Sequence, residues 1–576
     1  MSTAPDPAAA PPAAVPPPDA DADTNANANS HADTKTHANT DTDTDTDAAR
    51  LAALGYESHF RRDMSLWANF SLGFTYLSPV VGVYALFAFS LATAGPPMLW
   101  SLVIAGVGQL LVALVFGEVV SQYPVSGGIY PWARRLWGRR WAWMSGWVYL
   151  VALLATIASV SYGAGPYAAA MLGFEPSVTA TIGCALAILL IATLINLAGT
   201  RYLALAAIIG FSAELVGALV VGIWLLATER HHGLGVFFDG QGTGAGGSYA
   251  AAFLAASLIG IYQYYGFEAC GDVAEEVRDP AHRIPKAMRM TIYIGGAAAT
   301  FITLALVLSV ADFSAVISGA NADPVTTALT AAFGPTMVKV ILGIVLISFV
   351  SCAMSLQAAA SRLTYAYARD NMIVGSRVLA KFSPVRHVPP YALLLAAVLP
   401  ALLVIGSKVS TDALTKIISF AALGIYLAFQ MVVLAALRAR LKGWRPAGPF
   451  TLGRWGLAVN IAALVYGVAA MINMSWPRTP DVPWYDNYIV PLSAAIVIAT
   501  GLVYMATTHH YGRGTAPAGD AIPSDPIPSD PPSDPIPGDP IPSRSISSDP
   551  GRQESDSRQH GKAEGPGKTE GPGKAE

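Results

Sequence analysis

The chain has 576 residues, of which 53% are hydrophobic and 13% are charged, about half the charged share of an ordinary soluble domain. This composition excludes a typical water-soluble protein, because so much apolar surface needs a lipid environment. The formal net charge of −3 gives no indication of nucleic-acid binding. We therefore expect an integral membrane protein whose partner is the lipid bilayer, with no nucleic-acid partner.

Both ends of the chain are low in complexity and poor in apolar residues. Residues 1–50 consist mainly of Ala, Pro, Asp, Thr and Asn, and residues 512–576 repeat short units rich in Pro, Asp and Gly. Such segments bury too little apolar surface to offset the entropy lost on ordering. We expect two disordered tails flanking a membrane domain over residues 66–509.

The chain between the tails contains twelve apolar segments long enough to cross a membrane. A spanning helix needs about 20 mostly apolar residues. The predicted fold class is therefore an all-α integral membrane protein with twelve transmembrane helices. Their expected centres are Phe74, Leu110, Leu154, Ala187, Gly217, Ile261, Phe301, Ile347, Leu395, Leu423, Leu464 and Ile496.

Arginine and lysine gather in the loops after the second, sixth, eighth and tenth apolar segments. By the positive-inside rule, these loops and both tails are expected to face the cytoplasm. We predict a multi-pass protein of the cytoplasmic membrane with cytoplasmic N- and C-termini. The basic residues are Arg134, Arg135, Arg139 and Arg140; Arg278, Arg283, Lys286 and Arg289; Arg369, Arg377, Lys381 and Arg386; and Arg438, Arg440, Lys442 and Arg445.

The first and sixth apolar segments are interrupted in their middles. The first carries Ser-Pro-Val-Val-Gly at residues 78–82, and the sixth carries Tyr-Gly-Phe-Glu at residues 265–268. Proline removes a backbone donor and glycine weakens a helix, so each break frees amides and carbonyls. Matching breaks in two halves of a chain indicate an inverted-repeat transporter that holds its substrate near the midplane. The alternative is that both are kinks or sites of close helix packing.

The two breaks supply the candidate substrate-binding residues. The N-terminus of a half-helix presents amides that suit a carboxylate, and the carbonyls across the break suit an ammonium group. Tyr262 and Tyr265 are spaced three residues apart, as are Tyr265 and Glu268, and the tyrosines are expected to wall the site or to serve as ordinary aromatic packing. The candidate set is Ser78, Val81, Gly82, Val83, Tyr84, Tyr262, Tyr265, Gly266, Phe267 and Glu268.

Two acidic residues lie deep inside apolar segments, Glu268 at the second break and Glu214 at the centre of the fifth segment. A charge at the bilayer centre costs about 3 kcal/mol, so each is expected to be protonated, paired or functional. We interpret both as proton-coupling residues; the alternative for Glu268 is a structural carboxylate that accepts amide hydrogen bonds. Ser348, Ser351 and Ser355 share a helix face and could bind sodium, which is the less favoured coupling ion.

The remaining polar residues give no sign of catalytic chemistry. We find no metal-ligand spacing and no nucleophile motif, so we expect no enzyme, no metal and no cofactor. Glu275 and Glu276 follow the sixth segment beside Arg278 and Asp279. We interpret these four residues as a solvated, salt-bridged helix end.

Three ordered motifs then support a resemblance. Residues 116–130 combine Phe-Gly-Glu with Tyr-Pro and Ser-Gly-Gly, residues 265–286 hold Gly-Phe-Glu, Glu-Glu, Asp-Pro and Ile-Pro-Lys, and residues 361–370 read Ser-Arg-Leu-Thr-Tyr-Ala-Tyr-Ala-Arg-Asp. Together they resemble the amino acid-polyamine-organocation superfamily, specifically its bacterial amino acid permeases. The resemblance covers residues 66–509.

This resemblance implies a five-plus-five inverted repeat followed by two further helices. It also implies secondary transport of amino acids or related amines by alternating access, with the substrate held by the first and sixth helices. In related antiporters, the acidic residue matching Glu268 is linked to proton sensing and the aromatic residue matching Tyr262 to substrate. The chain departs from the family's Gly-x-Gly-Ile-Phe pattern, since residues 82–86 read Gly-Val-Tyr-Ala-Leu, and it lacks the fifth-helix lysine of some members.

The predicted function is therefore a proton-coupled amino acid permease. Two alternatives stay open: an amino acid/polyamine exchanger or organic-cation carrier, and a nutrient sensor that binds its ligand without transporting it.

Overall fold

A computed structural model describes most of the chain as α-helix. Within the described residues there is no strand, and only two isolated bridges join extended residues, Met64 to Val277 and Ser383 to Val388. The all-α fold class is thus confirmed. The described residues are 46–57, 59–175, 177–244, 247–408, 411–478, 482–512 and 514–515.

Most of both expected tails lies outside the described residues. The exception at the N-terminal side is residues 46–50, which belong to a helix that continues to residue 53. Leu51 and Leu54 are buried, so this helix packs on the membrane domain. At the C-terminal side, the Thr515 amide donates to the carbonyl of Asp370 at 3.1 Å.

The first five apolar segments form helices, and the first of them is divided. Prolines begin both α3 and the short helix η1, where the missing amide hydrogen carries no penalty. The elements are α2 (Leu66–Leu77), α3 (Pro79–Ala94), η1 (Pro96–Met98), α4 (Leu99–Gln122), α5 (Ile129–Trp137), α6 (Arg139–Leu172), α7 (Val178–Ala198), α8 (Thr200–Thr228) and η2 (Leu234–Phe238).

The next five segments repeat this arrangement, again with the first divided. The long helix α15 changes direction at Gly334, which has a φ of 71°. The elements are α9 (Tyr249–Ala256), α10 (Leu258–Gln263), α11 (Ala269–Asp272), η3 (Ala274–Glu276), α12 (Pro280–Met290), the π-helical turn η4 (Thr291–Gly295), α13 (Gly296–Ser309), α14 (Phe313–Ile317), α15 (Pro324–Arg369), α16 (Ser376–Leu379), α17 (Pro390–Gly406) and α18 (Thr411–Leu441).

Two further membrane helices complete the domain. They are α19 and α21, each 20 residues long. The last elements are η5 (Gly453–Trp455), α19 (Gly456–Ser475), α20 (Trp484–Asn487), α21 (Ile489–Thr508) and η6 (His510–Gly512).

The twelve expected transmembrane segments are all present as helices. Ten helical stretches of the described residues are long and apolar enough to cross a membrane, and two shorter apolar ones, Tyr249–Gln263 and Pro390–Gly406, account for the sixth and ninth segments. The sixth is short because it is broken. Large apolar side chains such as Val107, Val216 and Val465 are exposed on the outer faces of these helices, as lipid contact requires.

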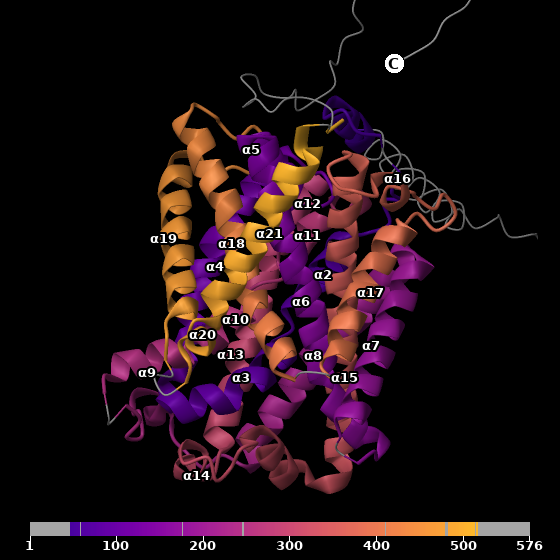
Figure 1. Ribbon diagram of the computed structural model, residues 1–576. Helices are drawn as coiled ribbons and strands as arrows, with labels where there is room; N and C mark the ends of the chain where they lie inside the picture. Colours follow the sequence, from indigo (N-terminus) through magenta and orange to yellow (C-terminus); the bar gives the residue numbers. More distant parts are fainter. Residues whose placement is uncertain are drawn as a thin grey trace, which may run out of the picture. The chain divides into compact units, whose positions relative to one another are not determined.

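The helices pack in matched pairs, as an inverted repeat requires. The third segment, α6, contacts α7, α17 and α18, and its counterpart in the second half, α15, contacts α17, α7 and α8. Helix α4 is the second segment, and α12 begins the seventh segment, its counterpart in the second half; these two helices also pack together. Figure 1 shows these helices running side by side, with α19 along one flank of the bundle.

The four basic loops meet at one end of the bundle, which we call the arginine-rich end. Arg134 follows the second segment, and its guanidinium nitrogen Nη1 lies 3.8 Å from Oδ2 of Asp370, which follows the eighth segment. Arg369 bonds to Glu275, after the sixth segment, at 2.9 Å. In Figure 1, α5 and α16 lie at this end and α14 lies at the opposite one.

Candidate functional site

The first helix break is one residue wide. Helix α2 ends at Leu77, Ser78 has a φ of 41° and a ψ of 90°, and α3 begins at Pro79. The Val81 amide donates to the Ser78 hydroxyl at 3.3 Å, and the Gly82 amide donates to the Ser78 carbonyl at 3.1 Å. The amides of Val81 and Gly82 are therefore already bonded within the chain.

Glu214 of α8 caps the start of α3. Its Oε1 accepts a hydrogen bond from the Ser78 hydroxyl at 2.6 Å and from the Val80 amide at 3.0 Å. The side chain is fully buried, and Oε2 has no hydrogen-bond partner among the described residues. Amides and the helix dipole favour a negative charge at a helix N-terminus, so a carboxylate suits the start of α3. Through this carboxyl group the fifth segment is joined to the first break.

The second break lies directly against the first. Helix α10 ends at Gln263, α11 begins at Ala269, and Gly266 between them has a φ of 118°, which only glycine readily adopts. A Cβ atom on Gly266 would lie 2.6 Å from the amide nitrogen of Leu77. The absence of a side chain at Gly266 thus allows the two backbones to touch.

Glu268 folds back over the second break. Its Oε2 accepts from the Gly266 amide at 2.7 Å, and its Oε1 accepts from the Tyr149 hydroxyl at 3.2 Å. The same hydroxyl lies 3.0 Å from Oδ2 of Asp272. Glu268 and Asp272 are both fully buried. Since one hydroxyl hydrogen cannot satisfy two carboxylates at once, this pair is suited to hold an additional proton.

Gln263 and two tyrosines bring further polar atoms to the breaks. The Gln263 Nε2 atom donates to the two carbonyls that precede α3, at 3.2 and 3.4 Å, while the Oε1 atom of the same side chain finds no hydrogen-bond partner in the described part of the chain. The ring of Tyr265 is edge-on to the rings of Tyr76 and Tyr262, with centroids 6.1 and 5.2 Å away. The hydroxyls of Tyr76 and Tyr265 are buried without a hydrogen-bond partner among the described residues.

The structure thus brings together most of the predicted substrate residues of the two breaks. Ser78, Val81 and Gly82 lie at the first break, and Gly82 faces Gln263 closely enough that any Cβ there would collide with it. Tyr262, Tyr265, Gly266 and Glu268 lie at the second break.

The other predicted substrate residues lie less directly at the breaks. Val83 is buried in the first turns of α3, and Tyr84, next to it, is half-buried. Phe267 instead packs among aromatic rings, with centroids 5.8 Å from Phe116 and 5.4 Å from Phe429. Its side chain therefore contributes to the contact of the second break with α4 and α18.

The predicted sodium-binding serines lie on the face of α15 that packs against α2 and α8. Ser355 and Thr75 share a hydrogen bond of 2.9 Å, and the hydroxyl of Ser348 donates to the carbonyl of Ile344 at 3.2 Å. Ser351 occupies the space that a side chain at Gly210 would need. Sodium binding at these serines stays a prediction.

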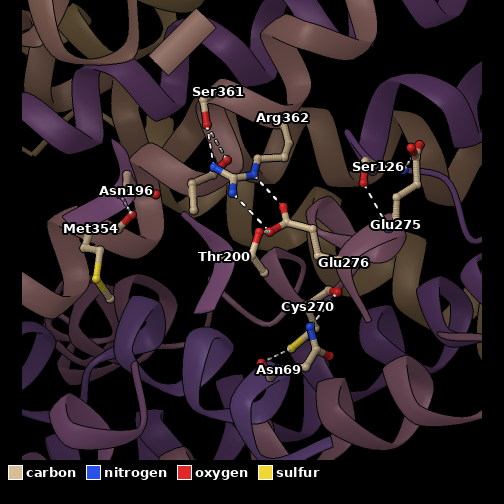
Figure 2. Close-up of polar contacts among 11 residues, drawn as sticks. Asn69, Ser126, Asn196, Thr200, Cys270, Glu275, Glu276, Met354, Ser361 and Arg362 are labelled. Atoms are coloured by element: carbon tan, nitrogen blue, oxygen red, sulfur yellow. Dashed lines mark hydrogen bonds and ion pairs between the residues drawn. The ribbon is translucent and has the colours of Figure 1, made fainter. Parts of the chain in front are cut away.

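A layer of buried ion pairs lies between α11 and the arginine-rich end. Arg362 of α15 donates to both carboxylate oxygens of Glu276, at 2.7 and 3.2 Å, and the Thr200 hydroxyl bonds to the same carboxylate at 2.5 Å (Figure 2). Arg369 donates to Glu275 at 2.9 Å. We call Glu275, Glu276, Arg362 and Arg369 the buried ion-pair layer.

This layer corrects the interpretation of the sixth segment's end. Glu275 and Glu276 are both 0% exposed, so the prediction of a solvated helix end is wrong. Their basic partners come from α15 rather than from Arg278, which donates to the carbonyl of Arg62. The layer joins α8, η3 and α15 by side-chain hydrogen bonds.

Three residues at the breaks escaped prediction from the sequence: Tyr149, Gln263 and Asp272. Asp272 had a detectable signal, because it follows Glu268 by four residues in the same apolar segment. Tyr149 and Gln263 had none. Each is one of several polar or aromatic residues in its helix, and only the packing of that helix directs it to the breaks.

Residues 64–500 match the family model described as amino acid permease. The chain belongs to the amino acid permease family. It is therefore a secondary transporter of amino acids that crosses a membrane several times, and it is not an enzyme. The predicted superfamily and the predicted class of function are confirmed, whereas the coupling ion stays a prediction.

The permease is similar to proteins of a plant and a fungus. It shares 28% identity over 493 residues with the amino-acid permease BAT1 of Arabidopsis thaliana, covering 81% of this chain and 95% of that one. It shares 24% identity over 485 residues with amino-acid permease 2 of Neurospora crassa, covering 81% and 88%. Placement among the bacterial permeases stays a prediction.

One solved structure is a more remote match. A manganese transporter of Eremococcus coleocola, in complex with an aromatic bis-isothiourea substituted compound, has a TM-score of 0.48 at 14% identity, covering 78% of this chain and 95% of that one. This likeness is too remote to inform the site.

Proposed function

We propose that this permease moves amino acids or related amines in symport with protons, and that it holds the substrate between the two helix breaks. The observation that carries the proposal is the placement of Glu214 and Glu268, one fully buried carboxyl group at each break. The buried ion pairs of the described residues all use other carboxylates. A buried carboxyl group without a basic partner is suited to take up a proton.

Glu268 is the principal proton site in this proposal. Its charged form is held by the Gly266 amide and by the hydroxyl that it shares with Asp272. Protonation weakens a charge-assisted hydrogen bond, so a proton on Glu268 loosens the contact that fixes the second break. Substrate and proton then act on the same element, which is how their movements become coupled. Glu214 is the second proton site, at the first break, and it is protonated only while the substrate site is empty.

The arginine-rich end faces the cytoplasm in this proposal, and the permease lies in the cytoplasmic membrane. The positive-inside rule supports this orientation, because the four basic loops meet at that end. We infer that the buried ion-pair layer acts as a gate at the same end, and that this conformation is the one closed toward the cytoplasm. Release of substrate into the cell then requires this layer to separate.

Uptake into proteoliposomes tests the proposed function. The purified full chain is reconstituted, and a panel of labelled amino acids is offered under an inward proton gradient or an inward sodium gradient. Concentrative uptake under the proton gradient alone is the expected result. Accumulation under the sodium gradient alone would contradict proton coupling. Flux only when the vesicles are loaded with substrate would identify an exchanger, and binding without flux would identify a sensor.

A further inference from the structure

We propose that Glu214 is the ligand of a substrate ammonium group, and that the permease prefers primary amines with a net positive charge. In this proposal the carboxylate of an amino acid is dispensable for binding. The inference rests on the proposed function, because it assumes that the substrate lies between the two helix breaks.

The donors that could bind a substrate carboxylate at the start of α3 are already engaged. The Val80 amide donates to Glu214, and the Val81 and Gly82 amides donate to the hydroxyl and carbonyl of Ser78. The chain thus supplies its own carboxylate at this helix N-terminus. A substrate carboxylate placed there would meet the negative charge of Glu214 instead of free amides, and like charges repel strongly at low dielectric.

The Glu214 carboxyl group has one oxygen left to bind a ligand. Oε1 carries both hydrogen bonds of the cap, whereas Oε2 is buried without a hydrogen-bond partner among the described residues. Buried polar atoms in native proteins are nearly always bonded, so an orphaned carboxylate oxygen indicates a missing donor. An ammonium group has three donor hydrogens and a charge opposite to that of Glu214.

The helices packed against α8 bring no free cation to Glu214. Helices α2, α3, α7 and α13 contain no lysine or arginine. On α15, Lys339 is exposed, and Arg362 and Arg369 are held in the buried ion-pair layer. Arg201 of α8 itself is exposed. A substrate cation would therefore supply the charge that the described surroundings of Glu214 lack.

Other groups at the breaks also suit a cation. Gln263 contributes a second buried acceptor, Oε1, without a hydrogen-bond partner among the described residues. Its Nε2 bonds to the carbonyls that precede α3, so Gln263 and Glu214 both contact the first break. The rings of Tyr76, Tyr262 and Tyr265 form a cluster beside it, and aromatic faces attract ammonium groups.

Three compounds of similar chain length test the proposal on the wild-type protein. Cadaverine is lysine without its carboxylate, and norleucine has the carboxylate and α-ammonium but an uncharged side chain. Binding of labelled lysine, cadaverine and norleucine is measured on the full chain in nanodiscs. We expect lysine and cadaverine to bind with similar affinity and norleucine to bind at least about tenfold more weakly, as the loss of a charge-paired contact implies.

A variant then assigns the effect to Glu214. In Glu214→Gln, the amide oxygen still accepts from Ser78 and Val80, but an NH2 group replaces Oε2. We expect cadaverine binding to weaken by at least about tenfold, with a smaller change for norleucine. Glu175→Gln is the matched control, because Glu175 is an exposed glutamate in the loop between α6 and α7. It should leave the binding of all three compounds unchanged.

Several results would overturn the proposal. They are norleucine binding more tightly than cadaverine, binding of none of the three compounds, or unchanged cadaverine binding in folded Glu214→Gln protein. The comparison of wild-type ligands stands even if the variant does not fold. Flux measurements separate this failure from that of the proposed function: proton-driven uptake of norleucine without binding of cadaverine would leave the permease function intact. Binding of cadaverine without flux of any compound would instead contradict the permease function.

Discussion

Glu214 and Glu268 are both buried, yet their carboxyl groups are held in different ways. Glu214 uses one oxygen for two hydrogen bonds to another helix, whereas Glu268 uses both oxygens, one of them on an amide only two residues away. Glu268 is thus tied to the shape of its own break. Its protonation state is expected to alter that shape directly.

The first prediction concerns Glu268→Gln. Glutamine can still accept from the Gly266 amide, but it cannot exchange a proton. A rate limited by one titrating group changes by up to about tenfold per pH unit, and we expect the variant to lose this dependence. The measurement is initial uptake across a range of external pH. Tyr149→Phe serves as the comparison, since it removes the shared hydroxyl and keeps the carboxyl group. An unchanged profile in Glu268→Gln would exclude the proton role.

The second prediction concerns Gly266→Ala. A Cβ at this position would lie 2.6 Å from the Leu77 amide nitrogen, and the φ of 118° would be strained as well. Such backbone strain alone costs about 1–3 kcal/mol, and the collision adds to it. We expect a lower melting temperature and little or no transport. Gly183→Ala is the control: no atom of the described residues lies within 4 Å of its Cβ position, so α7 should be unaffected or slightly stabilised. Equal melting temperatures for the two variants would refute the contact.

At the scale of single residues, the sequence predicts positions better than partners. Pro79 and Gly266 have local conformational effects, so both breaks could be located without a structure. The partner of Ser78 could not, because Glu214 lies 136 positions away and reaches it only through the packing of α8. The environment of Glu276 was predicted wrongly for the same reason, since Arg362 lies 86 positions further along.

At the scale of elements, the buried ion-pair layer fixes how α15 sits against η3 and α8. Removing one member of a buried ion pair leaves an uncompensated charge and costs about 3–5 kcal/mol, whereas removing both is far milder. The third prediction is that Arg362→Gln lowers the free energy of unfolding by about this amount. The double variant Arg362→Gln with Glu276→Gln should recover most of it. Urea denaturation in detergent gives the comparison, and equal losses in both variants would show that the pair is not coupled.

The same variants should also change access to Cys270. Its thiol is fully buried and hydrogen-bonded to the carbonyl of Asn69 at 3.4 Å, and it lies in α11, apart from the Arg362–Glu276 pair of the layer (Figure 2). In a background without Cys184 and Cys352, we expect maleimide to label Cys270 faster in Arg362→Gln than with Arg362 intact. Arg61→Gln is the control, because the Arg61 side chain is exposed and pairs with Asp63 outside the layer. Labelling at the control rate would show that the layer does not close this end.

At the scale of the whole molecule, twelve helices, the inverted repeat and the clustering of basic loops all follow from patterns in the sequence. Apolar length and loop charge are summed over many residues, so single errors matter little. The helix at residues 46–53 was missed because it is short and adjoins a low-complexity stretch. Leu51 of this helix and Leu54 just after it pack against the membrane domain rather than against their neighbours in sequence.

The fourth prediction concerns orientation. Glu175 follows α6 at the end opposite the arginine-rich one, and Lys381 lies beyond α15 at the arginine-rich end; both are exposed. A membrane-impermeant maleimide added to whole cells should label Glu175→Cys and spare Lys381→Cys. The native cysteines are buried, so the unaltered chain sets the background. Labelling of Lys381→Cys alone would reverse the proposed topology.

The contact between Gly266 and Leu77 joins the two halves of the permease through backbone atoms alone. The Gln263 side chain adds a hydrogen bond to the Leu77 carbonyl, whereas the rings of Tyr262 and Tyr265 do not form this contact. The choice of substrate and the joining of the two halves are thereby assigned to different parts of the chain. Substitutions of the side chains around the breaks can change the substrate preference and leave the backbone contact unaltered. The same arrangement of broken helices can therefore serve permeases with different substrates.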